Sequence, residues 1–140
     1  MECNTTISLN IKADEDRNHF IKALEAIKSI SITDDGSASN EISAANEYIG
    51  KTKFNINAED IYKHLKRLDT NINNIEVGRI SITVSLFPWD YPEELCNMLF
   101  PLLHEGGAER LECESTSEYG EQTLAYRNGR MFKTEEEYDL

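Results

Sequence analysis

Apolar and polar side chains alternate most regularly at residues 80–87, where Ile, Val and Leu are separated by Ser and Thr. A period of two is typical of a strand that buries one face and exposes the other. Residues 6–11 repeat this pattern, and residues 48–56 repeat it more weakly. The alternation therefore predicts a strand in each of these segments.

Apolar residues recur at helical spacing in other segments of the chain. Residues 15–29 and residues 57–68 each predict a helix behind an acidic or capping first turn. A third helix is predicted after Asp90, which we expect to cap it, and it ends at Gly106. Because proline inside a helix removes a hydrogen bond, we expect a kink or a break close to Pro101.

The C-terminal part of the chain carries a strong hairpin signal. Asn128-Gly129 separates two segments, residues 122–127 and 130–133, and Asn-Gly readily adopts the positive φ angles of a type I′ turn. A further strand is expected at residues 110–114, and residues 134–140 are expected to form a solvated acidic tail.

The connection at residues 33–46 is long for a small domain and begins with loop-forming residues, Asp-Asp-Gly followed by Ser-Ala-Ser. It could be a mobile loop, hold a short helix at residues 41–46, or serve in binding. We expect a mobile loop.

These elements predict an α+β fold in one domain, residues 1–133, followed by the acidic tail. The expected architecture is a ferredoxin-like α/β sandwich. Its sheet is mixed or antiparallel, about three helices cover one face, and a β-hairpin closes the C-terminus.

The chain has a formal net charge of −12, and the excess of acid is concentrated in its second half. Residues 71–140 hold 14 of the 26 Asp and Glu but only 5 of the 14 Lys and Arg. This charge repels a phosphate backbone, and no strong basic cluster compensates, so direct binding of nucleic acid is not expected. It would instead steer a basic protein toward this one.

The three cysteines, Cys3, Cys96 and Cys113, are odd in number and widely spaced. They predict neither a disulfide framework nor a zinc site, and a reducing cytoplasm fits them best. No segment approaches the roughly 18 apolar residues of a membrane span. We therefore expect a cytoplasmic protein with no membrane partner.

Motifs for catalysis, cofactors or metals are weak. Residues 14–25 place oxygen side chains as a calcium loop does, but His19 stands where the loop needs glycine. His19, His64 and His104 have no metal-ligand spacing, and the glycines form no phosphate-binding loop. The expectation is a protein that is not an enzyme and that binds no cofactor or metal.

Aromatic side chains stand among carboxylates in the second half of the chain. Tyr and Trp supply contact area in protein interfaces, and carboxylates steer a basic partner. Trp89 is nevertheless expected in the core, and Tyr126 could equally pack on the hairpin. The candidate partner-binding residues are Asp90, Tyr91, Glu112, Glu114, Glu118, Tyr119, Glu121 and Tyr126.

These features favour a small acidic inhibitor that occupies the basic, nucleic-acid-binding surface of a partner protein or nucleoprotein complex. An immunity protein and a phage-encoded anti-CRISPR or anti-restriction protein that mimics DNA are two forms of this hypothesis, and the chain could act as a monomer or a homodimer. One alternative is a small enzyme or ligand-binding domain with a pocket between the sheet and residues 33–46. Another is an assembly subunit that dimerises through a sheet edge.

Overall fold

The alternating segments become strands of one sheet, and the segments with helical spacing pack against it. The computed structural model describes residues 2–30, 38–88 and 90–139, and within them the chain forms six strands and four helices. In chain order these are β1 (Asn4–Asn10), α1 (Asp14–Lys28), α2 (Ser39–Ile49), α3 (Ala58–Arg67), β2 (Asn71–Val77), β3 (Ser81–Phe87), α4 (Glu93–Glu105), β4 (Glu109–Ser117), β5 (Gly120–Arg127) and β6 (Arg130–Glu137).

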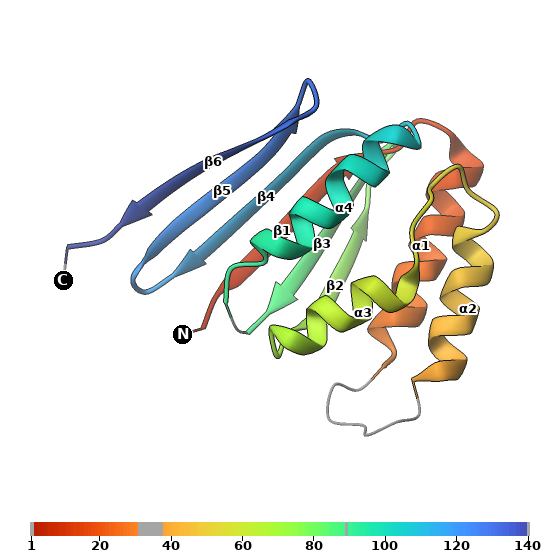
Figure 1. Cartoon of the computed structure of the whole chain (residues 1–140), viewed down its shortest axis with the longest axis horizontal. Helices are drawn as coiled ribbons and strands as arrows, with labels where there is room; N and C mark the ends of the chain where they lie inside the picture. The colour runs from red at the N-terminus through yellow and green to blue at the C-terminus, as the bar shows by residue number, and fades with distance from the viewer. Residues whose placement is uncertain (1, 31–37, 89, 140) are drawn as a thin grey trace.

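The sheet has the strand order β2-β3-β1-β4-β5-β6, and every neighbouring pair is antiparallel (Figure 1). Elements β1, α1, β2, β3, α4 and β4 follow one another as a βαββαβ unit, with α2 and α3 inserted before β2. This order gives the ferredoxin-like topology that the sequence predicts. Strands β5 and β6 extend the sheet beyond β4 as the expected closing hairpin, so the α+β class is confirmed.

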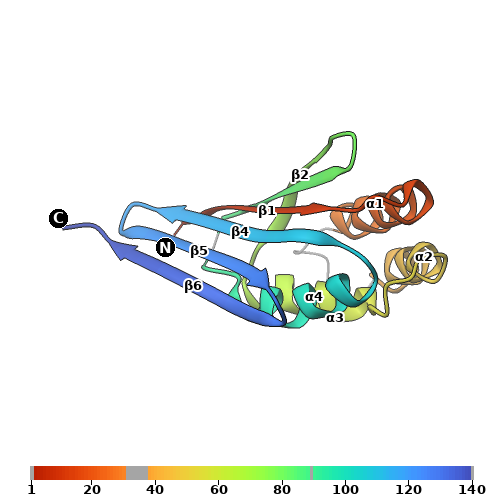
Figure 2. The ribbon, with the colours of Figure 1, turned by 90° about the horizontal axis from the view of Figure 1, so that it is seen from above.

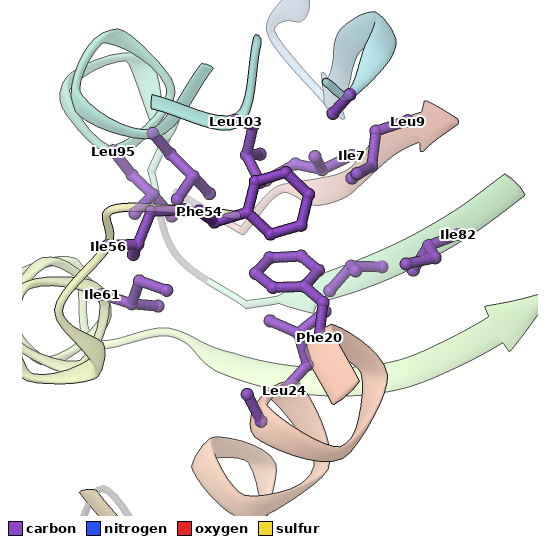
Figure 3. Close-up of a cluster of buried hydrophobic side chains, with 14 of the residues drawn as sticks. Ile7, Leu9, Phe20, Leu24, Phe54, Ile56, Ile61, Ile82, Leu95 and Leu103 are labelled. Atoms are coloured by element: carbon purple, nitrogen blue, oxygen red, sulfur yellow. The ribbon is translucent and has the colours of Figure 1, made fainter. Parts of the chain in front are cut away.

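One face of the sheet is buried under helices. Alternate side chains of β1 and β3, such as Ile7, Leu9 and Ile82, are buried and meet Phe20 of α1 and Leu103 of α4 (Figure 3). Figure 2 shows α3 and α4 together on one side of β1 and β4. A gap of about 30 Å³ in this core is lined by apolar side chains alone, and such a cavity offers a polar ligand no partner.

Helices α1, α3 and α4 occupy the segments in which apolar spacing predicts them. Helix α4 continues from Glu93 to Glu105 across Pro101, so the chain is not broken there. The flanking side chains of Phe100 and Leu103 are fully buried, and their packing keeps the helix continuous despite the lost hydrogen bond.

The prediction that Asp90 caps α4 is wrong. The N-cap position is Pro92, and no side chain among the described residues caps the helix. Asp90 accepts a hydrogen bond from the backbone N–H of Tyr91 at 2.8 Å instead, because it lies too far ahead of the first helical turn to reach its free N–H groups.

The strand expected at residues 48–56 is also wrong. Tyr48 and Ile49 end α2, and the chain from Gly50 to Asn57 has no strand partner among the described residues. The alternation suggested a strand because Phe54 and Ile56 are both buried. Their side chains fill the core from a segment without regular secondary structure, not from one face of a strand. The ring of Phe54 packs on that of Phe20, with centroids 5.4 Å apart.

The connection at residues 33–46 is only partly a loop. Residues 33–37 lie outside the described residues, whereas Ser39–Ile49 forms α2, so a helix replaces much of the expected mobile loop. Ala45 and Ile49 are buried where α2 packs on α1 and α3. Figure 1 shows α2 on the far side of α1 from the sheet.

Strand β2 was not expected, since its segment is rich in asparagine. Ile72 is buried against the core, and the backbone pairs with β3 through a register shift between Ile72 and Asn74. Pairing and burial at a sheet edge outweigh the weak intrinsic preference of asparagine for strands.

The closing hairpin turns at Asn128 and Gly129, whose φ angles of 52° and 77° are both positive, as a type I′ turn requires. Strand β6 continues to Glu137, so it extends into the segment expected to be an acidic tail. Its side chains from Thr134 to Glu137 are exposed, as expected for that segment.

Candidate functional site

The face of the sheet opposite the helices is uncovered in the described part of the chain. On β1 and β3 it carries small polar side chains, and on β4 to β6 it becomes acidic. We call the second region the acidic face, formed by Glu112, Glu114, Glu121 and Glu136.

Strand geometry fixes the spacing of these carboxylates. Glu112 and Glu114 are two residues apart on β4, which separates side chains on one face by about 7 Å. Glu121 lies directly opposite Glu136 in the β5–β6 register. Like charges in that position repel each other, so the arrangement lowers the stability of the hairpin.

Few cations in the described residues neutralise the acidic face. Arg127 reaches Glu112 at 3.8 Å. No ion pair forms between a described Lys or Arg and Glu114, Glu121 or Glu136. The negative charge there is therefore available to an external partner.

A hollow of about 380 Å³ opens at one end of this region, beside the β4–β5 turn. We call it the tyrosine hollow, and its lining residues are Tyr91, Tyr119, Gly120, Glu121, Glu135, Glu136, Glu137 and Tyr138. Figure 1 shows the β4–β5 turn, the end of β6 and the start of α4 at the same end of the sheet. Three separate segments thus contribute one tyrosine each.

Hydrogen bonds hold the tyrosine hollow together. Tyr138 donates its backbone N–H to the carbonyl oxygen of Tyr119 at 2.9 Å, and the Tyr91 hydroxyl lies 3.4 Å from the Ser117 hydroxyl. Ser117 also accepts a hydrogen bond from the N–H of Tyr119 at 3.2 Å. The turn and the segment before α4 are therefore tied to each other.

The surroundings raise the pKa of two of these tyrosines. A hydrogen bond to the Glu118 carboxylate raises the pKa of Tyr119. Partial desolvation and the charges of Glu121 and Glu136 raise the pKa of Tyr138. Both rings thus present an uncharged aromatic face to any ligand.

The structure brings together several residues that the sequence singles out. Tyr91, Tyr119 and Glu121 line the tyrosine hollow, and Asp90 and Glu118 are their chain neighbours. Glu112 and Glu114 lie on the acidic face. Together these residues occupy adjoining surfaces of the sheet.

Tyr126 lies near the opposite end of β5 from the tyrosine hollow, where it lines a separate surface hollow with Glu112 and Arg127. It is half-buried on the helix-covered face of β5, and its ring meets that of His104 edge-on, with centroids 5.4 Å apart. Trp89 lies outside the described residues.

Sequence reasoning missed the contribution of β6. Glu135, Glu136, Glu137 and Tyr138 all line the tyrosine hollow, although their segment reads as a solvated tail. The hairpin register would have found them, because pairing outward from Asn128-Gly129 sets Glu136 opposite Glu121.

Other candidate chemistry is limited. In the described residues no three His, Cys, Asp or Glu side chains are grouped to hold a metal ion. The segment that resembles a calcium loop is helical, and Asp14 there pairs with Arg17 at 2.7 Å. Of residues 33–46, the alternative site of a pocket against the sheet, the structure describes residues 38–46, and there Ser39–Ile49 forms α2, which packs on α1 and α3.

None of the helices formed by the described residues has both the length and the apolar character needed to cross a membrane. Comparison of the chain with models of protein families, with curated proteins and with solved structures finds no match in any of the three.

Proposed function

We propose that this chain is a small acidic inhibitor that occupies a basic, nucleic-acid-binding surface of a partner protein. The observation that carries the proposal is the set of unneutralised carboxylates on the acidic face, including Glu121 directly opposite Glu136. A repulsive pair of this kind costs stability. Binding of a basic partner would relieve this repulsion, and the relief would contribute to the free energy of binding.

Recognition combines two adjoining surfaces. The acidic face gathers several negative charges on neighbouring strands and so attracts a surface that binds the phosphates of a nucleic-acid backbone. Such charges mainly accelerate association and select basic partners. Direct binding of nucleic acid is disfavoured by the same charges.

The tyrosine hollow supplies the contact area that charges alone lack. Its three tyrosines and neighbouring carboxylates suit a guanidinium or ammonium group, which aromatic rings attract through their faces and carboxylates attract directly. A partner's Arg or Lys side chain is therefore the proposed occupant. Tyrosine and arginine are also the residues that most often dominate binding energy at interfaces.

Two biological forms fit this chemistry. One is the immunity partner of a nuclease-like toxin, and the other is a phage-encoded protein that disarms a defence complex by imitating DNA. Both would act in the cytoplasm, which is supported by three buried cysteines that are free thiols.

The test uses a charge variant and a matched control. The variant Glu112→Gln, Glu114→Gln, Glu121→Gln removes three charges from the proposed surface. The control Glu25→Gln, Glu47→Gln, Glu105→Gln removes three exposed charges from the helices. Each protein is immobilised, exposed at low salt to a lysate of the native host, and washed with rising salt.

The proposal expects a basic protein to be retained by the natural chain and the control, released by salt, and lost by the variant. The released protein should bind nucleic acid only when this chain is absent. Equal retention by the variant and the natural chain would contradict the proposal.

A further inference from the structure

Strand β6 lies at the edge of the sheet and has one strand neighbour among the described residues, β5. Figure 1 shows it as the outermost strand on that side of the molecule. An edge strand presents a row of backbone N–H and C=O groups that can pair with another strand. The side chains of β6 determine which strand fits.

Alternate residues of β6 direct their backbone groups toward β5. Just beyond the strand, Tyr138 donates its N–H to the carbonyl oxygen of Tyr119 at 2.9 Å. Because inward and outward groups alternate along an antiparallel strand, the even-numbered residues bond to β5 and the odd-numbered ones face outward. Lys133 and Glu135 therefore have backbone groups on the free edge.

The charge along β6 changes sign halfway. Arg130 and Lys133 come first, and Glu135, Glu136 and Glu137 follow. When a strand pairs antiparallel with itself, the first half of each copy meets the second half of the other, so this strand is complementary to itself. We propose that β6 pairs antiparallel with β6 of a second copy of this chain, centred on Thr134.

The charges favour this register over its neighbours. Centred on Thr134, the pairing sets Lys133 opposite Glu135 of the other copy twice, and no like charges face each other. A pairing centred on Lys133 would set Lys133 directly opposite Lys133 of the other copy. A pairing centred on Glu135 would set two glutamates opposite each other in the same way. Like charges in direct opposition repel, so both registers are unfavourable. A centre at Phe132 would form neither ion pair.

The pairing would join two six-stranded sheets into one continuous sheet, with the acidic faces of both copies side by side. Helix α4 packs on β4 and β5 and reaches β6 through Glu93, whose carboxylate lies 3.3 Å from the Lys133 ammonium. This side-chain contact leaves the backbone at the outer edge of β6 accessible. A contact along one strand is smaller than the roughly 1,200–2,000 Å² of a stable interface, so the dimer should depend on protein concentration. This inference stands independently of the proposed inhibitory function.

The first test is sedimentation of the purified full chain over a range of concentrations, without any partner. In the proposed register residue 133 of each copy faces residue 135 of the other, so Lys133→Glu or Glu135→Lys alone sets like charges opposite each other at both of these pairs. We expect either substitution to weaken association roughly tenfold. Combining the two changes reverses each ion pair and should restore association. Glu76→Lys, on β2 at the opposite edge, makes the same charge change as Glu135→Lys and should leave association unaltered.

The second test is a disulfide at the centre of the pairing. Directly opposed residues in a pair without hydrogen bonds have Cα atoms about 4.5 Å apart, within reach of a disulfide. With oxidised glutathione as the oxidant, Thr134→Cys should therefore give a linked dimer. Thr123→Cys, on the interior strand β5, should not.

The proposal is overturned if the natural chain is a monomer at every concentration. It is equally overturned if the combined charge swap fails to restore association, or if Thr134→Cys cross-links no faster than Thr123→Cys. Circular dichroism of each variant establishes that it is folded, so that a loss of association is not a loss of structure.

Discussion

Among single residues, Cys96 of α4 and Cys113 of β4 illustrate how burial decides chemistry. Both thiols lie in the core. A hydrogen bond with Cys113, together with burial, holds the pKa of Cys96 well above its ordinary value of 9.0. Since the thiolate is the nucleophilic form, Cys96 is a structural residue rather than a reactive one.

We predict that stability falls and thiol labelling rises together at alkaline pH. Folding favours the protonated thiol of Cys96, so its contribution to the free energy of unfolding is complete below the ordinary pKa of 9.0 and is lost as the pH rises toward the raised value. The same hydrogen bond lowers the pKa of Cys113, which offsets part of this loss. Urea unfolding and labelling with a thiol reagent at a series of pH values measure both. Cys96→Ala should flatten the dependence of stability on pH, and an unchanged slope would contradict this account.

The sequence allowed the residues of the candidate site to be selected, but it did not show which of them lie together in the fold. Tyr91, Tyr119 and Glu121 could be selected because aromatic and acidic residues interleave in the sequence. Their meeting in one hollow depends on the β4–β5 turn and on Tyr138, which no local pattern connects. Tyr126 could not be assigned to either face in advance, because the position of a tyrosine on a strand does not tell which face is covered.

For secondary-structure elements, the closing hairpin is the clearest case in which a local signal determines structure. Asn128 and Gly129 both adopt positive φ angles, and the whole β5–β6 register follows from their turn. The Glu121–Glu136 pair of the acidic face and the edge of β6 are therefore positioned by two residues.

We predict that Gly129→Ala destabilises the protein by about 1–2 kcal/mol, the cost of a left-handed conformation for a residue with a side chain. The φ angle of Gly129 is 77°, and no atom lies within 4 Å of the added Cβ, so strain rather than collision would cause the loss. Thermal unfolding measures the effect. Gly50→Ala is the control, because Gly50 has a φ angle of −61°. Its added Cβ would lie 3.2 Å from the carbonyl oxygen of Asn46 but would bear no left-handed strain, so stability should change less. Equal effects of both substitutions would contradict the explanation.

Elements with a strict local period were predictable, and elements defined by distant partners were not. Strands β1 and β3 alternate regularly because each buries one face. Strand β2 exists through its pairing with β3, and Phe54 is buried through its contact with Phe20, so neither follows from a local pattern. Helix α2 was anticipated only as one alternative, a short helix at residues 41–46, because loop-forming residues stand immediately before it.

Across the whole molecule, the charge of −12 is distributed unevenly over the fold. The helix-covered face of the sheet is a conventional apolar core, whereas the opposite face gathers carboxylates on β4, β5 and β6. Repulsion among these carboxylates opposes folding in the absence of a partner. Under the proposed function, these carboxylates serve binding at the expense of stability.

We predict that Glu136→Gln stabilises the isolated protein, by on the order of 0.5 kcal/mol, because it removes the like charge opposite Glu121. Added salt should also stabilise the natural protein more than the variant, since screening and substitution relieve the same repulsion. Thermal unfolding at low and high salt measures both effects. Glu25→Gln, which removes an exposed charge from α1, should not reproduce the gain. If Glu136→Gln left stability unchanged, the acidic face would carry no energetic cost, and its charges would give no reason to infer a basic partner.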